Sequence, residues 1–403
     1  MAKVTLSEGV YWVGAVDWNV RSFHGFTTPY GITYNAYLIV DEKITLIDTV
    51  KYPFYEEMLE KIKEIVSPQE INYLISNHVE MDHSSSLPLI FKETPNAQLI
   101  ATKRGIAGLR KYYKESPLVK GVGGCLPFVP VKEGDELSIG KRTLKFIETP
   151  MLHWPDSMAT YLVDEGILFS MDAFGQHLAT SRRFDDEVGL EIIMPEAAKY
   201  YANIVMPFGS QVLKTIDKAK DLKINMLATS HGVIWRQNIG TIIESYVKWA
   251  NGEAEEKVLV IYDTMWNSTE MMAKALVKGI INEGVEVKLF KLTGSDTSEI
   301  IKEVLTAKAI LVGSPTLNNG MFPTVAGFLE YMRGLRPKGK IGAAFGSYGW
   351  GKGAVRGIEE MLQKTKIEVL DANLEFQFVP DKEELQKCVE FGSSVARQVK
   401  REA

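Results

Sequence analysis

Residues 78–83, with the sequence His-Val-Glu-Met-Asp-His, carry four side chains that can bind a metal ion within six positions. They directly follow an apolar stretch, residues 72–76, that is typical of a buried strand. In an extended segment alternate side chains point the same way, so His78, Glu80 and Asp82 can converge on one side. Several ligands on one short loop favour metal binding. Residues 78–83 therefore predict a metal site, and the alternative is a solvated polar loop that caps a helix.

Three more ligand-type side chains, His153, Asp172 and His231, are each the first of their kind past the end of a predicted strand. Strand ends are the positions where sites collect in layered α/β proteins. Together with residues 78–83 they suffice for two metal ions that share a carboxylate and leave positions open for substrate. The candidate ligands are His78, Glu80, Asp82, His83, His153, Asp172 and His231.

The ligand segment resembles that of the metallo-β-lactamase fold, whose usual run is His-x-His-x-Asp-His. Glu80 stands where that run has its second histidine. An anionic oxygen in place of a neutral nitrogen shifts the metal preference from zinc towards iron or manganese and stabilises a higher oxidation state. Such a site can hold two redox states, which hydrolysis would not require.

Two further histidines, His24 and His177, have no ligand pattern around them, and we interpret each as a structural or pocket-wall residue rather than as a ligand. His177 follows Asp172 by five positions and can reach a substrate pocket. With nearby tyrosines, these two histidines are the candidate proton donors for catalysis. Asp156, three positions after His153, is interpreted as a turn residue.

A phosphate site is predicted after the apolar strand Val258–Tyr262, where the hydroxyl-rich run 263–269 leads into a helix. Backbone N–H groups, hydroxyls and a helix N-terminus suit a phosphate dianion. The run has no lysine and no GxGxxG pattern, which excludes the nucleoside-triphosphate loop and argues against a dinucleotide. Helix capping alone is the alternative explanation.

Two later loops, residues 314–320 and 346–351, follow the next strands of the same sheet and add glycines and aromatic side chains. A phosphate site beside aromatic rings that can stack on a planar ligand indicates FMN, whereas ordinary packing of these rings is the alternative. The predicted FMN-binding residues are Thr264, Met265, Trp266, Asn267, Ser268, Thr269, Pro315, Thr316, Leu317, Asn318, Asn319, Ser347, Tyr348, Gly349, Trp350 and Gly351.

The elements that position these sites fall into two parts, divided at the polar stretch 251–256. Residues 1–250 open with antiparallel strands, including a hairpin around residues 41–43, and continue with strands and helices, among them a long helical segment over 191–220. This mixture predicts a metallo-β-lactamase-like αββα sandwich. Residues 251–403 alternate strand and helix, which predicts a flavodoxin-like doubly wound parallel sheet of order 2-1-3-4-5.

The 403 residues include 45% hydrophobic and 24% charged side chains, as in a globular protein. The net charge of −5 argues against nucleic acid or an anionic membrane as partner. The two cysteines, Cys125 and Cys388, exclude a disulfide framework, a CxxC metal site and a cysteine-ligated iron–sulfur cluster in this sequence. No apolar run reaches the ~18 residues of a membrane helix, and no signal peptide is recognisable. We therefore expect a soluble, cytoplasmic protein.

Residues 78–83, 153–157, 230–232 and 264–269, taken with Asp172, resemble those of the flavodiiron proteins, or A-type flavoproteins, and come close to the rubredoxin:oxygen oxidoreductase type. The resemblance covers the whole chain. It implies a metallo-β-lactamase-like diiron domain at residues 1–250 and a flavodoxin-like FMN-binding domain at residues 251–403. It also implies that one iron is bound by His78, Glu80 and His153 and the other by Asp82, His83 and His231, with Asp172 as the bridge.

By the same resemblance the chain reduces O2 to water, NO to N2O, or both, at two iron ions. Electrons pass through FMN from a donor such as rubredoxin, a reductase or a reduced deazaflavin. Because the sequence has no CxxC pair, we expect this donor to be a separate molecule. The resemblance further implies a head-to-tail homodimer, or a dimer of dimers, in which the FMN of one subunit lies next to the irons of the other.

Two other functions fit parts of the sequence. A dinuclear metallohydrolase with a regulatory flavin domain would carry zinc and hydrolyse esters or thiolesters, and Glu80 counts against it. A non-enzymatic electron carrier would bind FMN but no iron. The choice between O2 and NO stays open, because it depends on pocket residues that the sequence does not place.

Overall fold

The computed structural model describes residues 3–116 and 128–402, so that Cys125 lies outside the described residues. The chain forms two compact units, each with its own hydrophobic core. The first unit contains the residues up to Tyr200 and Ser210–Tyr246, and the second contains Tyr201–Gly209 and the residues from Val247 onwards. Within the described ranges, no helix combines the length and the apolar composition that a bilayer crossing requires.

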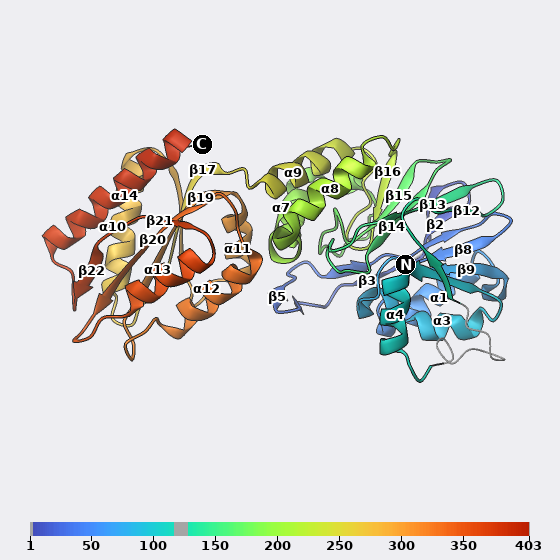
Figure 1. The fold of residues 1–403 in the computed structure, drawn as a ribbon, viewed down its shortest axis with the longest axis horizontal. Coiled ribbons are helices and arrows are strands. Elements are labelled where there is room, and N and C mark those ends of the chain that lie inside the picture. The colour runs from blue at the N-terminus through green and yellow to red at the C-terminus, as the bar shows by residue number, and fades with distance from the viewer. Residues whose placement is uncertain (1–2, 117–127, 403) are drawn as a thin grey trace. The chain divides into compact units, whose positions relative to one another are not determined.

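The first unit is built on two sheets that enclose a core of side chains such as Trp12, Ile75 and Phe146, each at most 1% exposed (Figure 1). The larger sheet has the strand order β1 (Val4–Ser7), β2 (Val10–Trp12), β7 (Tyr37–Ile39), β8 (Ile44–Ile47), β9 (Ile71–Ile75), β10 (Gln98–Thr102) and β11 (Phe128–Val131). The smaller sheet has the order β12 (Glu136–Ser138), β13 (Thr143–Glu148), β14 (Met158–Leu162), β15 (Ile167–Met171) and β16 (Met226–Thr229).

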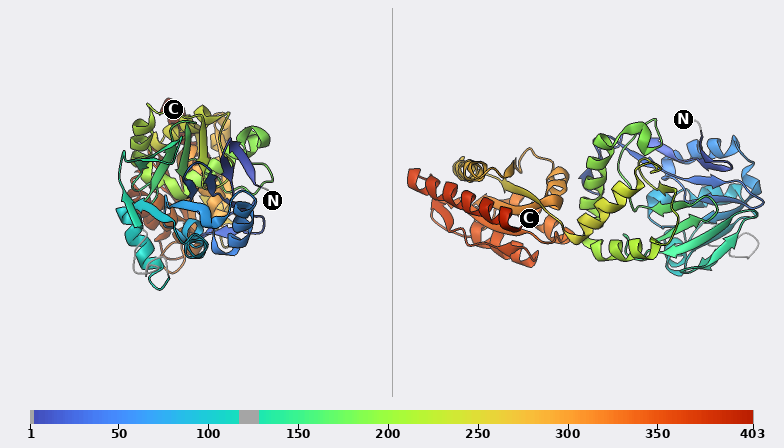
Figure 2. Two further views of the ribbon diagram at one scale, coloured as in Figure 1. Left: turned by 90° about the vertical axis from the view of Figure 1, so that its right-hand side faces the viewer. Right: turned by 90° about the horizontal axis from the view of Figure 1, so that it is seen from above.

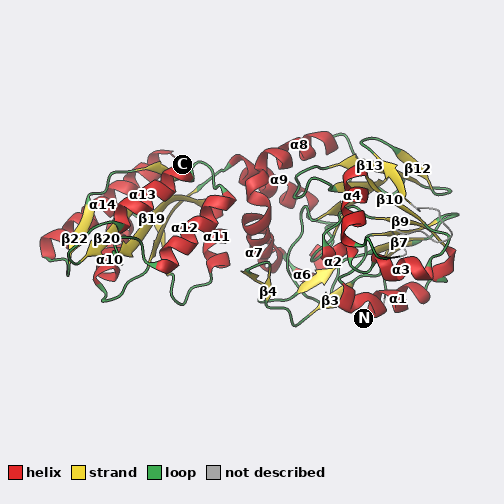
Figure 3. Ribbon diagram, turned by 60° about the horizontal axis from the view of Figure 1, so that its bottom comes forward, coloured by secondary structure: helices red, strands yellow, loops and turns green. Residues whose placement is uncertain are grey.

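Helices cover the outer faces of both sheets, which completes the predicted αββα sandwich (Figure 3). Those near the larger sheet are α1 (Tyr55–Lys63), α3 (Leu87–Glu93) and α4 (Lys103–Tyr112), and those near the smaller sheet are α7 (Leu190–Tyr200), α8 (Gly209–Ala219) and α9 (Ile239–Asn251). The unit also contains the short helices α2 (Met81–Ser84) and α6 (Asp185–Val188). Two small ribbons pair β3 (Ala15–Asp17) with β6 (Ile32–Tyr34), and β4 (Ser22–Phe23) with β5 (Phe26–Thr27).

The strand pairing brings the carboxyl ends of distant segments together. The predicted hairpin is confirmed, because β7 and β8 pair antiparallel with Tyr37 opposite Ile47. Beyond it the larger sheet continues with parallel neighbours, β8, β9 and β10. In the smaller sheet β15 and β16 are also parallel. Loops that leave β9, β15 and β16 therefore start at the ends where layered α/β folds place their sites.

The helical segment predicted over residues 191–220 is divided rather than continuous. Helix α7 ends at Tyr200, a π-helical turn covers Tyr201–Val205, a 3-10 turn covers Met206–Phe208, and α8 then begins. Pro207 lies in the 3-10 turn, and proline lacks the N–H group that a continuing α-helix needs. The interrupted piece is the part of this segment that belongs to the second unit.

The second unit is a parallel sheet with the order β18 (Glu286–Lys291), β17 (Glu255–Tyr262), β19 (Ala307–Pro315), β20 (Ile341–Tyr348) and β21 (Glu368–Val369), and β22 (Leu374–Gln377) also pairs with β20. In order along the chain this is the predicted 2-1-3-4-5 arrangement. The fifth strand consists of the short pieces β21 and β22 with an irregular stretch between them.

Helices cover both faces of this sheet, as a doubly wound fold requires. They are α10 (Ser268–Asn282), α11 (Thr297–Thr306), α12 (Pro323–Leu335), α13 (Ala354–Lys364) and α14 (Lys382–Glu402). Figures 1 and 2 show α10 and α14 side by side on one face and the other three on the opposite face. The flavodoxin-like architecture predicted for this part of the chain is thereby confirmed.

Lys340, at the start of β20, is buried in the second unit and allows a test of its stability. Its ammonium donates to the Leu305 carbonyl oxygen at 2.9 Å, and the side chain is 4% exposed. Burial, with the nearby charges of Lys308 and Lys257, lowers its pKa from 10.5 to about 7. The unfolded chain therefore binds more protons than the folded chain between these two values, so this lysine costs stability at neutral pH and less as the pH rises.

We expect Lys340→Met to stabilise the second unit by about 1–3 kcal/mol at pH 7, and by clearly less at pH 10. Thermal unfolding followed by circular dichroism at both pH values measures the gain. Lys364→Met, which alters an exposed lysine of α13, is the matched control and should change the unfolding temperature little at either pH. An equal gain at pH 7 and pH 10 would contradict the electrostatic explanation.

Candidate metal centre and flavin pocket

Residues 78–83 lie where the chain leaves β9 and turns into the short helix α2. Glu80 is the N-cap residue of α2, and Asp82 and His83 lie within the helix. Because helical geometry starts at Met81, Asp82 does not continue the alternation of His78 and Glu80. The three side chains predicted to converge on one side consequently divide, and Asp82 joins a different group of ligand atoms.

The seven candidate ligands form two adjacent groups. In each group, one ligand atom from every residue lies within 4.8 Å of the others. The first group consists of His78, Glu80, His153 and Asp172, and the second of Asp82, His83 and His231. Side chains from α2 and from the loops after β9, β13, β15 and β16 therefore meet in one place. Apart from Asp172, which the resemblance gave as the bridge, the two groups are those that the resemblance implied.

Asp172 faces both groups with its two oxygens. Its Oδ2 lies 3.1 Å from Nε2 of His153, while its Oδ1 lies 3.2 Å from Nε2 of His83 and 3.5 Å from Nε2 of His231. The residue before it, Met171, ends β15 with a φ of 61°, a left-handed conformation that is costly for a side chain with a Cβ. A single carboxylate between two ligand groups is the arrangement that a bridged pair of metal ions needs.

Several buried polar atoms at this site have no hydrogen-bond partner among the described residues. They are both carboxylate oxygens of Asp172, Oδ1 of Asp82 and both ring nitrogens of His83. A buried polar group left unpaired costs about 1–3 kcal/mol, so such a concentration of them indicates that cations complete the site. Imidazole nitrogens with hard carboxylate oxygens form a donor set that suits iron. The residues present fit two iron ions.

Carboxylates and imidazoles compensate each other's charge when no cation is bound. Burial by itself lowers the pKa of His78, but Asp156 and Glu80 raise it to about 9. Burial acts the same way on His153, and Asp172 and Glu80 raise its pKa to about 10. At neutral pH protons thus hold the positions that metal ions would take, and metal binding has to release them.

The three loops predicted to bind FMN surround a cavity of about 730 Å³ at the carboxyl ends of the strands in the second unit. All the predicted residues line this cavity except Asn267 and Thr269. Asn267 is the N-cap of α10 in a left-handed conformation, and the Thr269 hydroxyl lies 3.1 Å from that of Ser347. These two residues therefore shape the loop rather than line the space.

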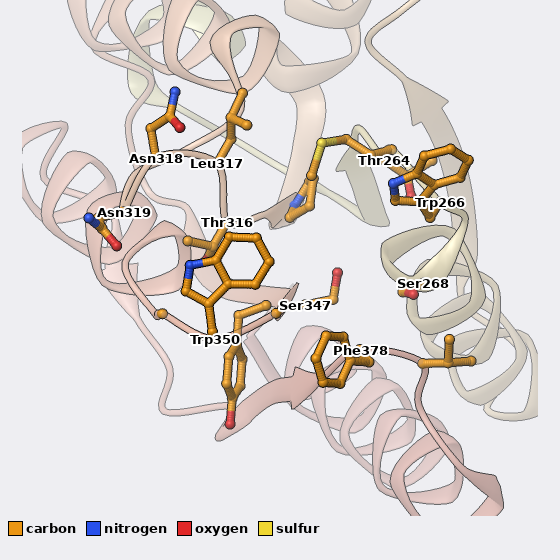
Figure 4. A pocket seen from close by; sticks show the side chains of 16 residues that line it. Thr264, Trp266, Ser268, Thr316, Leu317, Asn318, Asn319, Ser347, Trp350 and Phe378 are labelled. Carbon is orange, nitrogen blue, oxygen red and sulfur yellow. The ribbon is translucent and has the colours of Figure 1, made fainter.

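The cavity suits a flat ring that carries a phosphate. In Figure 4 the indoles of Trp266 and Trp350 lie on different sides of the space, with Ser347 between them. The Thr264 hydroxyl oxygen is buried without a hydrogen-bond partner among the described residues, and no side chain caps the N-terminus of α10. Unused hydroxyl and N–H groups at a helix N-terminus bind a phosphate without a cation. The pocket therefore fits FMN.

Comparison with known proteins agrees with both sites. Residues 32–232 match the model of the ODP family beta lactamase, and residues 260–392 match that of flavodoxin. A nitric oxide reductase of Moorella thermoacetica is 50% identical over 98% of each chain. The rubredoxin oxygen:oxidoreductase of Desulfovibrio gigas has a TM-score of 0.95 at 38% identity over 99% of each chain, and the flavodiiron protein of Giardia intestinalis has 0.94 at 39% identity over 100% of this chain and 97% of its own. The chain belongs to the flavodiiron protein family.

Membership of the flavodiiron family confirms the resemblance and the predicted fold. The predicted cofactors, FMN and two iron ions, are those of this family. A coenzyme F420H2 oxidase of Methanothermobacter marburgensis is 41% identical over 99% of each chain. The relatives are oxidoreductases, which confirms the enzyme class that the resemblance implied.

The two candidate proton donors of this flavodiiron protein have different surroundings. His24 lies between β4 and β5 with 58% of its side chain exposed, and its Nε2 is 2.9 Å from Oε1 of Glu80. His177 is buried, stacks on Phe26 at 5.3 Å and meets the ring of His231 at 5.3 Å. Burial, aided by the charge of His231, holds the pKa of His177 well below 6.5, so its ring is neutral at pH 7.

Sequence reasoning missed several residues around the two sites. Asp156, interpreted as a turn residue, accepts hydrogen bonds with Oδ2 from His78 Nδ1 at 3.0 Å and from the Val79 amide at 2.9 Å. Phe378 and Val379 line the flavin cavity. They follow β22, so the strand-end rule that identified the loops after the earlier strands would have found them had it been applied to this strand as well.

We expect Asp172→Ala to remove iron from the flavodiiron protein while FMN stays bound, because the substitution affects both ligand groups but no residue of the flavin cavity. Elemental analysis should find close to no iron, and the flavin absorption spectrum should remain that of the unaltered protein. Asp186→Ala, at an exposed carboxylate paired with Arg236, is the control, and this variant should retain both iron ions and FMN. Two irons per chain in the Asp172 variant would overturn the bridging assignment.

Proposed function

We propose that this flavodiiron protein reduces NO to N2O at a pair of iron ions, and that O2, reduced to water, is its second candidate substrate. The observation that carries the proposal is the position of Asp172 between two groups of ligand atoms. The nitric oxide reductase that is 50% identical favours NO. The rubredoxin oxygen:oxidoreductase with a TM-score of 0.95 supports O2 as the second candidate.

In this proposal His78, Glu80 and His153 would hold one iron, Asp82, His83 and His231 would hold the other, and Asp172 would be shared by both. Two ferrous ions and reduced FMN would together supply four electrons, which suffice for one O2 or for two pairs of NO. The ligands themselves are mostly buried, with His78, Asp82, His83, Asp172 and His231 each at most 5% exposed. Their burial excludes bulk water and keeps the two positions at a fixed separation.

We assign the proton-handling roles to His24 and His177. NO reduction consumes two protons per N2O formed, and O2 reduction consumes four, so the pocket needs a path for protons. His24 touches Glu80 and is largely exposed, which suits a residue that passes protons from solvent. His177 is neutral, and its Nε2 has no hydrogen-bond partner among the described residues, so it suits a hydrogen-bond donor that orients the bound gas.

FMN is assigned to the cavity of the second unit, with the phosphate at the Thr264–Thr269 loop. A separate donor would reduce it, and the names of relatives support rubredoxin or coenzyme F420H2 in this role. A reductase or another reduced deazaflavin is the remaining possibility. The indoles of Trp266 and Trp350 line this cavity and are 87% and 96% exposed.

For the assembly we propose a head-to-tail homodimer, alone or paired into a dimer of dimers, with a cytoplasmic location. The support for the assembly is the exposed apolar rim of the flavin cavity, formed by Trp266, Trp350, Phe378 and Val379. We also propose residues 250 and 251 as the main boundary between the two domains along the sequence, with the stretch Tyr201–Gly209 as an excursion of the chain into the second unit.

Anaerobic turnover of the iron-loaded, FMN-reduced protein with each gas separately tests the function. We expect consumption of NO, followed with a gas electrode, with N2O found by gas chromatography, and a separate trace with O2 to compare rates. The Asp172→Ala variant provides the iron-free control. Zinc in the purified protein together with esterase turnover, or FMN without iron when all seven ligands are intact, would contradict the proposal.

The roles of the two histidines are tested in the same assay. His24→Gln and His177→Gln should each lower kcat by about 100-fold or more if the lost group handles protons in the rate-limiting step. Iron and FMN content should be unchanged, since neither residue is among the seven ligands. Unaltered kcat in both variants, at full iron content, would show that protons reach the site by another route.

A further inference from the structure

The two ligand groups contribute equal sets of donors to the metal positions. Each supplies two imidazoles and one terminal carboxylate, Glu80 in the first group and Asp82 in the second, and they share Asp172. On these donors alone the two irons would be alike. Any difference between them has to come from the residues behind the ligands, which set how strongly each imidazole donates electrons.

The imidazoles differ in the hydrogen-bond partners of their Nδ1 atoms. Nδ1 of His78 is hydrogen-bonded to a carboxylate, Oδ2 of Asp156, at 3.0 Å, and both side chains are at most 5% exposed. Nδ1 of His231 is 2.7 Å from a neutral acceptor, the backbone carbonyl of Thr33. Nδ1 of His83 has no hydrogen-bond partner among the described residues. The imidazole that is hydrogen-bonded to a carboxylate, His78, therefore belongs to the first group.

Two other contacts do not cancel this difference. Asp48 is a second buried carboxylate near the ligand segment, and its charge acts on His83 of the second group more than on His78 of the first. Its two oxygens, however, accept hydrogen bonds from the backbone and side-chain amides of Asn77, whereas Asp156 is hydrogen-bonded to an imidazole directly. His24 donates to Glu80 on the first group and withdraws some electron density, yet its side chain is 58% exposed, so water already competes for that contact.

We propose that Asp156 is a positioning residue that makes the two irons unequal, holding His78 in the tautomer whose Nε2 faces the metal and making the iron of the first group the harder one to reduce. The proposal rests on the proposed diiron function and deepens it. A hydrogen-bonded carboxylate gives the imidazole partial anionic character, which stabilises the ferric state. Reduction is then ordered, with the second-group iron accepting the first electron.

Asp156→Asn removes the negative charge of the side chain but keeps its shape and an acceptor oxygen. Oδ2 of Asp156 accepts both hydrogen bonds, from His78 and from the Val79 amide, and an asparagine oxygen can accept the same two. We expect this variant to keep two irons and to show a smaller separation between the two one-electron reduction potentials, because the lower one rises. Redox titration of the iron-loaded protein, with the mixed-valent form counted by electron paramagnetic resonance, measures both potentials. An unchanged separation, or an equal shift of both potentials, would overturn the proposal.

Asp156→Ala removes the acceptor as well as the charge. Loss of such a partner typically weakens metal binding by about 10–100-fold, so we expect one of two Co²⁺ ions to bind more weakly in chelator competition. The asparagine variant should bind both nearly as tightly as the unaltered chain. Tight binding of both ions by the alanine variant would overturn the positioning role, and this measurement does not depend on redox behaviour.

Asp185→Asn is the matched control, because Asp185 is equally buried and accepts hydrogen bonds from the backbone amides of Arg236 and Asn238, away from the ligands. It should leave both potentials and both affinities unchanged. If gas turnover fails while the potentials and affinities change as expected, the proposed function is wrong and the role of Asp156 stands. If gas turnover is retained and the potentials of Asp156→Asn are unchanged, the proposed function stands and the role of Asp156 is wrong.

Discussion

Buried negative charge is the constraint on which the first unit depends. Glu80, Asp82 and Asp172 lie together in the fold, and within the described ranges no lysine or arginine pairs with them; four imidazoles and metal ions must compensate their charge. This requirement explains why four strand ends and a short helix meet at one point, and why Met171 is held in a strained conformation beside Asp172. The hydrophobic core between the sheets fixes the positions of the strands. The need to compensate the carboxylate charge determines which side chains follow the strand ends, namely histidines and metal-binding acids.

The second unit binds its anion in a different way. Among the described residues, no lysine or arginine lines the flavin cavity, so the phosphate of an FMN bound as proposed would depend on hydroxyls and backbone N–H groups at the start of α10. Without a charge at the phosphate, the potential of the flavin would be set by the surroundings of its ring, which the cavity lining of Trp266, Tyr348 and Trp350 would supply. The chain thus has two different sites. In the first unit metal ions would compensate buried carboxylate charge, and in the second unit hydroxyl and N–H dipoles would bind the phosphate of the flavin.

Much of this could be predicted from the sequence, because the informative residues follow strands. The sheet of the second unit has the predicted 2-1-3-4-5 order, and the candidate ligands come together in two groups, as the family resemblance implied. Local geometry was harder: nothing in the residue types shows that helix starts at Met81, and this is what moves Asp82 to the second group. Asp156 could not be distinguished from a turn residue, because its partner His78 lies 78 positions away.

The segment Tyr201–Gly209 affects how the two units can be separated. The chain leaves the first unit after Tyr200, returns at Ser210 and leaves again after Tyr246. Within the second unit the Asn203 side chain donates to the Ser298 carbonyl and accepts from the Tyr331 hydroxyl. A single cut near residue 250 would separate this stretch from the helices on which it packs. The flavodoxin-like part therefore cannot be exchanged as one continuous piece of sequence. A fusion or domain exchange would have to keep the stretch Tyr201–Gly209 together with the residues from Val247 onwards.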